Sequence, residues 1–259
     1  MAQLTAILSD IHSNLAALTA VLKDVEEQGA DRVVCLGDVI GYGPQPIECA
    51  DIARKNFAFT ILGNHEEAVL YGAVGFNPKA KAAIDWTRDQ LNLESEPIER
   101  NREFWNFLGR LKRSHLEGDF LFVHGSPREP TREYIFSQDF QDRKKMDEIF
   151  ASPRGVEWQV CFTGHTHFPG IFSQENPYRF HEPRALSHTF DLVGLDHRII
   201  VNVGSVGQPR DGDNRSSYVI LEDTQLRFKR IEYDVQATIA RFKDTELPEY
   251  LARRLEEGK

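Results

Sequence analysis

The chain has 259 residues, enough for one large domain or two small ones, and 41% of them are hydrophobic, so a core can form without disulfides. Its 31 Lys and Arg face 40 Asp and Glu, a formal net charge of −9. A non-specific nucleic-acid binder needs a dense positive surface, so this acidic composition argues against one. A local cluster of cations could still bind a small phosphorylated ligand.

The cysteines and the N-terminal segment indicate a reducing compartment. The three cysteines, Cys35, Cys49 and Cys161, are odd in number and widely spaced, which argues against a disulfide framework. The first residues lack the positive charge and the long hydrophobic run of a signal peptide. No stretch approaches the ~18 hydrophobic residues that a membrane helix needs. We therefore expect a cytoplasmic protein without a membrane partner.

The first half of the chain alternates short hydrophobic runs with helical spacing. Strands are predicted at 4–8, 32–36 and 57–62, with helices at 14–27 and 46–55 between them. This alternation favours a parallel sheet, in which the loops at the carboxyl ends of the strands share one edge. Residues 64–114 predict an insertion of two or three helices.

The second half changes from parallel units to a meander. Strands are predicted at 120–123 and 160–163, with a helix near 140–150 between them, and then at 185–193, 198–203, 217–221 and 226–233. A closing helix is predicted at 234–257, broken near Pro248. We therefore predict a single α/β domain over residues 1–259, with two mixed β-sheets packed face to face and flanked by helices.

Polar side chains of a few kinds follow five of the predicted strands. In chain order they are Asp10 and His12, then Asp38, then Asn64-His65-Glu66, then His124, and last His165 and His167. Open α/β folds place their sites at this edge of the sheet, so we expect these side chains to lie together. The other four histidines, at 115, 181, 188 and 197, are assigned to the surface, to turns or to hydrogen-bonded core positions.

Taken alone, most of these motifs have an ordinary structural explanation. A Gly-Asp pair after a strand is usually a turn, and Asn64 with Glu67 could form a capping box at the start of a helix. His165 and His167 are more specific, because an i, i+2 pair on an extended segment can chelate an ion. The repetition at five strand ends is what favours a shared site.

The side chains of this set suit divalent metal ions. Carboxylates and imidazoles without thiolates favour Mn, Fe, Zn, Ni or Co over a structural zinc–thiolate site. Their number exceeds what one tetrahedral ion takes, which favours two ions that share a carboxylate, an arrangement used for phosphoryl displacement. The candidate metal ligands are Asp10, His12, Asp38, Asn64, His124, His165 and His167.

The motifs and their order resemble those of the calcineurin-like metallophosphoesterase superfamily: Asp10-x-His12, Gly37-Asp38, Gly63-Asn64-His65-Glu66, His124-Gly125 and Gly164-His165-x-His167. The resemblance implies one ion held by Asp10, His12, Asp38 and His167. It implies a second ion held by Asp38, Asn64, His124 and His165. Asp38 would bridge the two.

The same resemblance implies a mechanism. The two ions would lower the pKa of a bridging water, and the resulting hydroxide would attack phosphorus in line. His65 would not be a ligand but would face the phosphate and protonate the leaving oxygen. The expected substrate is a small phosphodiester or phosphomonoester. Two alternatives stay open: hydrolysis of a nucleotide or dinucleoside polyphosphate, and a non-catalytic metal-binding scaffold, which tends to lose the histidine at this position.

The chain departs from the protein Ser/Thr phosphatases and diadenosine tetraphosphatases of this superfamily. Gly41 stands where the protein phosphatases have the Asp that orients the catalytic histidine. Tyr42 replaces a phosphate-binding Arg, and Leu62 replaces another. Neither side chain can reproduce the bidentate contacts of a guanidinium. We therefore expect a member of the small bacterial and archaeal phosphodiesterase-like branch rather than a protein phosphatase.

Besides Asn64, two residues are candidates for contact with the substrate. Tyr42 lies in a glycine-rich loop, and its alternative role is packing against the following helix. Arg210 ends a second glycine-rich loop, 202–210, and could supply the missing guanidinium. The alternative for Arg210 is a surface ion pair with Asp211 or Asp213, worth at most about 1 kcal/mol.

Overall fold

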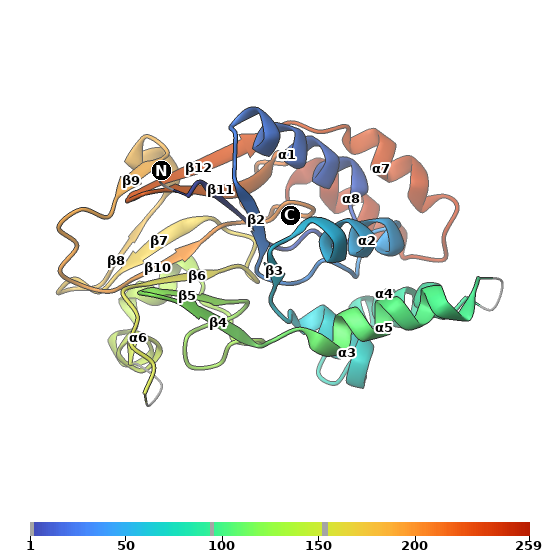
Figure 1. Ribbon diagram of the computed structural model, residues 1–259, viewed down its shortest axis with the longest axis horizontal. Coiled ribbons are helices and arrows are strands. Elements are labelled where there is room, and N and C mark those ends of the chain that lie inside the picture. Colours follow the sequence, from blue (N-terminus) through green and yellow to red (C-terminus); the bar gives the residue numbers. More distant parts are fainter. Residues whose placement is uncertain (1–2, 94–95, 152–154) are drawn as a thin grey trace.

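Two β-sheets form the centre of the computed structural model, which describes residues 3–93, 96–151 and 155–259 (Figure 1). The strands of the first sheet are β1 (Thr5–Leu8), β2 (Arg32–Cys35), β3 (Phe59–Thr60), β9 (Thr189–Asp191), β11 (Ser216–Glu222) and β12 (Gln225–Ile231). Those of the second are β4 (Ser114–Glu117), β5 (Phe120–Val123), β6 (Val160–Thr163), β7 (Gly170–Ser173), β8 (Arg179–His181) and β10 (Ile199–Asn202).

The helices form the outer layers. They are α1 (Leu15–Glu27), α2 (Pro46–Asn56), α3 (Asn64–Tyr71), α4 (Pro78–Leu91), α5 (Ile98–Arg110), α6 (Arg143–Phe150), α7 (Val235–Phe242) and α8 (Glu249–Glu257). Two 3₁₀ turns, η1 (Ser137–Gln141) and η2 (Pro183–Leu186), complete the elements. In the part of the chain that the structure describes, no helix is long and hydrophobic enough to cross a membrane.

Successive side chains of a strand point to opposite faces of the sheet and therefore pack in different layers. Ile7 of β1 points between the sheets, where it joins Val34, Phe122 and Phe162 in one buried cluster. Its neighbour Leu8 points to the opposite face, into the cluster covered by α1. A third cluster lies between the second sheet and α6. The chain therefore forms the expected α/β sandwich of two mixed sheets between helices.

Sheet topology brings six parallel strand ends to one place. The first sheet has the order β3-β2-β1-β11-β12-β9, in which β1, β2 and β3 are parallel. The second has the order β4-β5-β6-β10-β7-β8, in which β5, β6 and β10 are parallel. The loops after β1 and β10 are joined, because Val206 N donates to Ser9 O at 3.0 Å and Gly207 N to Asp10 O at 2.9 Å.

Several elements differ from the sequence-based expectation. The predicted strand at 57–62 is reduced to two residues, and the one at 185–193 begins as η2 because Pro183 starts a tight turn. Strands β4, β7 and β8 were not predicted from the sequence. β4 alternates exposed and half-buried residues and so has no hydrophobic run. The insertion holds three helices, and the break near Pro248 is confirmed, since Pro248 is the N-cap of α8.

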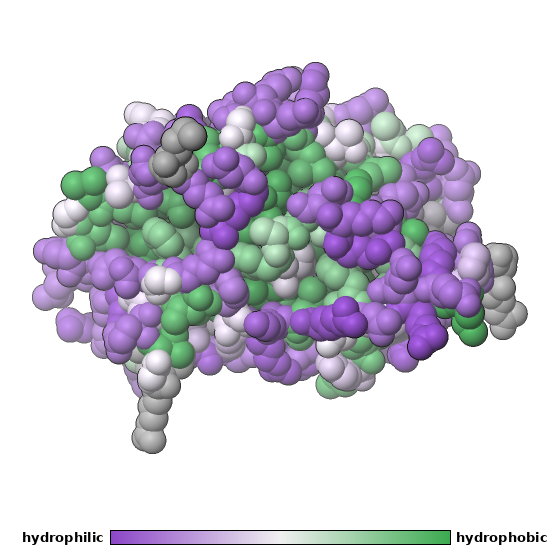
Figure 2. Space-filling model, viewed as in Figure 1, coloured by the Kyte–Doolittle hydropathy of each residue, from purple (hydrophilic) through white to green (hydrophobic). Residues whose placement is uncertain are grey.

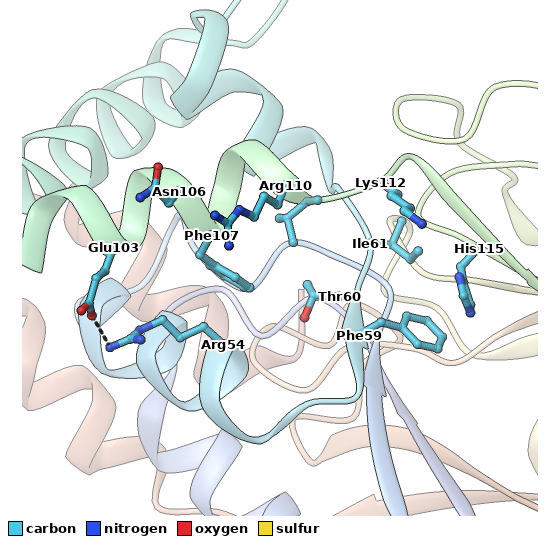
Figure 3. Close-up of a pocket in the computed structure, with 11 residues that line it drawn as sticks. Arg54, Phe59, Thr60, Ile61, Glu103, Asn106, Phe107, Arg110, Lys112 and His115 are labelled. Atoms are coloured by element: carbon cyan, nitrogen blue, oxygen red, sulfur yellow. Dashed lines mark ion pairs between the residues drawn. The ribbon is translucent and has the colours of Figure 1, made fainter.

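A cavity of about 560 Å³ opens beside β3 and α5, away from the joined loops. Figure 3 shows Arg54, paired with Glu103 at 2.8 Å, at one end of it and Phe59 with His115 at the other. None of the candidate ligands lines this cavity. On the face seen in Figure 2, hydrophilic side chains cover most of the helical layers and hydrophobic ones show mainly toward the middle. The motif residues lie elsewhere, at the ends of the strands.

Gly37 is required by the close approach of two of these loops. Its φ is +101°, and a Cβ atom there would lie 2.6 Å from the backbone nitrogen of Gly63. Gly29 also has a positive φ, +73°, but its added Cβ would meet nothing within 4 Å. We expect Gly29→Ala to cost about 1–2 kcal/mol, from backbone strain alone. Gly37→Ala should cost about 1–3 kcal/mol more, because the backbone cannot move aside.

Urea unfolding of the two variants and the parent measures this difference. Equal losses in Gly29→Ala and Gly37→Ala would mean that the two loops can separate at little cost.

Candidate metal centre

The seven candidate metal ligands and His65 lie together in one buried place at the ends of the strands. Asp10 and His12 follow β1, Asp38 follows β2, and Asn64 begins α3 just after β3. From the second sheet, His124 follows β5 directly, while His165 and His167 follow β6. The seven candidate ligands and His65 are each at most 7% exposed. Polar groups buried to this degree need partners, so their mutual geometry decides what the site can hold.

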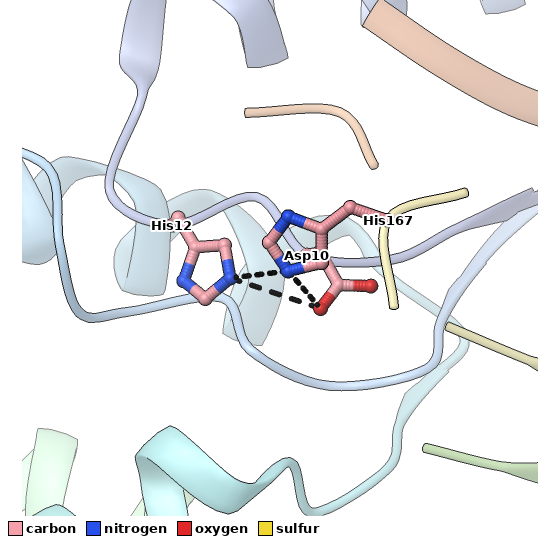
Figure 4. A group of neighbouring side chains, drawn as sticks. All are labelled: Asp10, His12 and His167. Carbon is pink, nitrogen blue, oxygen red and sulfur yellow. Dashed lines mark hydrogen bonds and ion pairs between the residues drawn. The ribbon is translucent and has the colours of Figure 1, made fainter. Parts of the chain in front are cut away.

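The first group of donors contains Asp10, His12 and His167 (Figure 4). His12 Nε2 lies 3.1 Å from His167 Nε2 and 3.7 Å from Asp10 Oδ1. His167 Nε2 lies 3.1 Å from the same carboxylate oxygen. The three donor atoms therefore surround one small space.

The hydrogen bonds around His167 indicate what fills that space. His167 Nδ1 lies 2.5 Å from the carbonyl oxygen of Gln208, and a carbonyl only accepts, so Nδ1 carries the proton. Burial and the charge of Arg210 lower the pKa of His167, which keeps the ring neutral. Its Nε2 then presents a lone pair to Asp10 Oδ1, an oxygen that has no hydrogen-bond donor of its own. Two acceptors in contact repel unless a cation lies between them.

The second group contains Asp38, Asn64, His124 and His165. His124 Nε2 lies 3.0 Å from Asn64 Oδ1, 3.0 Å from His165 Nδ1 and 3.3 Å from Asp38 Oδ2. Each ring has its other nitrogen on a backbone carbonyl: His124 Nδ1 is 2.9 Å from Leu36 O, and His165 Nε2 is 3.1 Å from the carbonyl oxygen of Arg132. These outer contacts direct both lone pairs inward, as carbonyls behind metal-bound histidines do.

A proton or a metal ion can relieve the repulsion in the second group. Burial opposes protonation of His124, but the Asp38 carboxylate outweighs it and raises the pKa of His124 to about 9. Burial and the neighbouring charge of His124 lower the pKa of His165 to about 3. One added proton therefore satisfies the cluster only in part. The donor set of carboxylates, imidazoles and one amide oxygen fits divalent cations.

Asp38 lies between the two groups. Its Oδ2 is 3.3 Å from His124 Nε2 and 3.7 Å from His12 Nε2, while Oδ1 accepts from His65 N at 2.9 Å. Burial alone would raise the pKa of Asp38, but the surrounding histidines lower it, so the carboxylate stays ionised. Its Oδ2 therefore lies beside histidines of both groups. His65 also lies near, in a third set with His12 and Asp38.

The loops that carry the ligands have strained backbones. Ten non-glycine residues in the described ranges have a positive φ, and seven of them lie in these loops: Asp10, His12, Ser13, Asp38, Tyr42, His165 and His167. Such conformations cost about 1–3 kcal/mol each and cluster at functional sites. Gly164 lets the loops meet, because a Cβ there would be 2.0 Å from Ser9 Oγ.

Glu66 connects the loops after β2 and β3 by hydrogen bonds. Its carboxylate accepts from Asp38 N at 2.8 Å, Gly63 N at 3.0 Å and Ile40 N at 3.1 Å. Burial and the charge of Asp38 raise the pKa of Glu66 to about 7. The carboxylate that caps the start of α3 is thus Glu66, and not Glu67 as one sequence-based explanation of Asn64 had it. Glu67 instead pairs with Arg113 at 2.7 Å and with Arg132.

His65 is oriented by ring packing rather than by a carboxylate. Its ring lies 4.3 Å from that of Tyr42, 4.8 Å from that of His12 and 5.4 Å from that of Phe76. Its Nδ1 is buried without a partner and lies against Gly41, where a Cβ would come within 2.1 Å. The absence of a side chain at Gly41 therefore makes room for this ring. Burial lowers the pKa of His65 to about 4.

Arg210 does not form either of the surface ion pairs considered for it. Asp211 pairs with Arg230, and Asp213 pairs with Arg215 at 2.7 Å. Arg210 donates to Gln208 Oε1 at 2.8 Å, and its Nε is buried without a partner. Arg210 N donates to the carbonyl oxygen of His167 at 3.3 Å, so the residue lies beside the centre. Together with burial, its charge lowers the pKa of His12, His65 and His167.

Tyr42 packs in a different direction from the one considered. It lies beside His12 at 4.7 Å between ring centroids, and Arg210 is 5.9 Å from its ring. Its other neighbours are hydrophobic residues of α4, α7 and α8 rather than of α2. Tyr42 therefore connects the centre to the C-terminal helices.

Sequence reasoning missed four residues near the centre. Tyr134 stacks on His165 with ring centroids 3.7 Å apart, and Phe76 lies against His65. The backbone of Arg132 accepts from His165. Burial and the charge of Arg210 lower the pKa of Arg254 on α8. No motif marks these residues, because only tertiary packing brings them near.

The four histidines left out of the candidate set stay outside it in the structure. His115, His181 and His197 lie beside carboxylates of Glu117, Glu175 and Asp196, respectively. His188 is exposed.

Comparisons with known proteins identify the family of the chain. Residues 4–225 match the calcineurin-like phosphoesterase superfamily domain. The uncharacterized protein MJ0912 of Methanocaldococcus jannaschii is 34% identical in an alignment of 262 positions that covers 97% of either chain. The crystal structure of a metallophosphoesterase from Sphaerobacter thermophilus is similar over the full length of both chains, with 35% identity and a TM-score of 0.77.

The fold is shared more widely than the sequence. The hypothetical protein PH1004 of Pyrococcus horikoshii OT3 is 19% identical, with a TM-score of 0.73 over 99% of this chain and 98% of that one. On the family match and the two relatives above 30% identity, the chain belongs to the calcineurin-like phosphoesterase superfamily.

Proposed function

We propose that the protein hydrolyses a small phosphodiester or phosphomonoester at a centre of two divalent transition-metal ions. One ion would be held by Asp10, His12, Asp38 and His167, and the other by Asp38, Asn64, His124 and His165. The observation that carries this proposal is the convergence of inward-facing lone pairs in both groups, with Asp38 Oδ2 within 3.7 Å of both His12 and His124. When bound, such a pair of ions supplies Lewis acidity to the phosphoryl oxygens and lowers the pKa of water.

The chain's own residues would bind the ester and supply the proton. Arg210 has an unpartnered Nε and would bind the phosphate from the side of Tyr42. Asn64 also lines a small cavity beside the second group of donors and would contact the phosphate. His65 would protonate the leaving oxygen through Nε2, since Nδ1 lies against Gly41. A phosphate anion beside His65 would raise the pKa of that ring above its value in the free protein.

A panel of phosphomonoesters and phosphodiesters, assayed with Mn, Ni, Co, Zn and Mg in turn, tests the proposal. Hydrolysis that strong chelation abolishes supports it. A protein that binds metal but hydrolyses nothing in the panel would favour the non-catalytic scaffold instead.

Asp38→Asn should lose more metal and more activity than His12→Gln. Asp38 would contact both ions, and a shared anion screens the repulsion between two dications. We expect about two ions per parent chain, measured by elemental analysis after desalting. Near-parental metal content and rate in Asp38→Asn would refute the bridging role.

His65→Gln should retain both ions and lower kcat by about 10²- to 10⁴-fold for esters of alkoxide leaving groups. The loss should shrink for nitrophenyl esters, whose leaving groups need little protonation. His115→Gln is the matched control, because His115 is a half-buried histidine of β4 that pairs with Glu117 and belongs to neither group of donors. Equal losses for both kinds of leaving group would show that His65 binds phosphate rather than donating a proton.

Arg210→Ala should lower kcat/KM by about 10- to 150-fold while metal content stays unchanged, as expected for the loss of one charge-assisted contact. Arg210→Lys should restore only part, because an ammonium cannot replace a bidentate guanidinium. The exposed Arg253 provides the control variant, Arg253→Ala. Parental rates in Arg210→Ala across the panel would assign this loop a structural role only.

A further inference from the structure

A second feature of the centre concerns the part of the substrate that is not phosphate. A cavity of about 320 Å³ adjoins the second group of donors, and Asn64 and His165 form part of its lining. Binding pockets for small molecules begin at about this size. A substituent on a phosphate held at the centre would therefore extend into this space.

Aromatic rings from three separate segments line the cavity. Tyr42 comes from the loop after β2, Phe76 from the loop between α3 and α4, and Tyr134 from the loop after β5. Tyr134 lies nearly parallel to His165, with an angle of 22° between the rings. Tyr42 and Phe76 lie beside His65, with Phe76 at 90° to its ring. Two of the aromatic residues that line the cavity thus also contact His65, the proposed proton donor.

Several apolar side chains at the rim of the cavity are exposed to solvent. Val74, which lines it, is 75% exposed, and Tyr134 is 40% exposed. Phe136, stacked parallel to Tyr134 at 5.4 Å, is 46% exposed. These three residues belong to none of the four hydrophobic clusters formed by the described residues. Exposed apolar groups gathered at a cavity indicate a ligand with an apolar surface.

Asn77 adds a polar contact of fixed direction. Its Oδ1 accepts from Lys79 N at 3.1 Å and Ala80 N at 3.0 Å, as the N-cap of α4. These two bonds use the amide oxygen and leave the amide nitrogen as an available donor on a residue that lines the cavity. A ring that carries acceptor atoms would be recognised at this position.

We propose that this cavity binds a planar aromatic group, a nucleobase or an aryl ring, that is carried by the alcohol esterified to the phosphate. The inference rests on the proposed function, because it takes the phosphate to lie at the adjoining centre. The aromatic walls supply stacking surface, and the phosphate fixes the distance of the ring from the metal positions. Stacking on aromatic side chains tolerates different rings, since each has a π-face.

Paired substrates with matched leaving groups test the inference. Adenosine 5′-monophosphate and ribose 5-phosphate both release a primary sugar hydroxyl, but only the first carries an aromatic ring. Benzyl phosphate and cyclohexylmethyl phosphate form the second pair. We expect kcat/KM to be about 10-fold or more higher for the aromatic member of at least one pair. Preference in the first pair alone identifies a nucleobase, and preference in the second alone an aryl ring.

Phe76→Ala and Tyr134→Ala should each reduce that preference ratio toward one. The ratio is informative because damage to the metal ligands or to His65 would slow both members of a pair alike. Tyr71→Ala is the matched control, since Tyr71 is 74% exposed and does not line the cavity. Equal rates for the aromatic and non-aromatic members of both pairs would overturn the inference while leaving the proposed hydrolysis intact.

Direct binding separates the two proposals if hydrolysis is absent. Saturation-transfer NMR would measure contact of uncharged adenosine and benzyl alcohol with the protein. Binding that Tyr134→Ala and Phe76→Ala abolish and Tyr71→Ala retains supports the cavity assignment even without turnover. No contact with either compound, together with no ring preference, would refute it.

Discussion

Electron-pair donors buried within about 3 Å of one another are the constraint on which this structure depends. His124 Nε2, His165 Nδ1 and Asn64 Oδ1 share one space, and His167 Nε2 faces Asp10 Oδ1 in another. Neighbouring acceptors in a low-dielectric interior repel, so the fold holds them together through outside contacts. The carbonyls behind the imidazoles fix the ring orientations, and the three amide hydrogens on Glu66 fix the loops. The centre is thus preorganised for cations.

Backbone strain accompanies this arrangement. The ligand loops turn immediately after their strands, and a short turn that points the side chain inward puts residues such as Asp10 and His165 into the left-handed region. Asp and His tolerate that region better than bulky or branched residues do. Glycine occupies the positions where loop meets loop, as at Gly37 and Gly164. The choice of residues in the motifs therefore reflects conformation as well as ligand chemistry.

Much of the centre could be predicted because its signals are local. Hydrophobic runs located the parallel strands, and the polar residues just after them had to share an edge. The structure brings all seven candidate ligands together there, although their coordination of metal stays a prediction. The short strands β4, β7 and β8 gave no hydrophobic run. The ring packing around His65, the stack of Tyr134 on His165 and the approach of α8 depend on tertiary contacts between segments far apart, which no single-sequence pattern records.

The chain order of the ligands also bears on folding. Each donor group draws on both sheets: His12 and His167 are 155 residues apart, and Asn64 and His124 are 60 residues apart. Bringing the ends of a 155-residue loop together in an unfolded chain costs about 5 kcal/mol of free energy through lost chain entropy. An ion would therefore bind weakly to the unfolded chain and tightly to the folded one, and its binding would stabilise the fold. A bound ion would therefore hold the two sheets together, and it could bind tightly only once both sheets have formed.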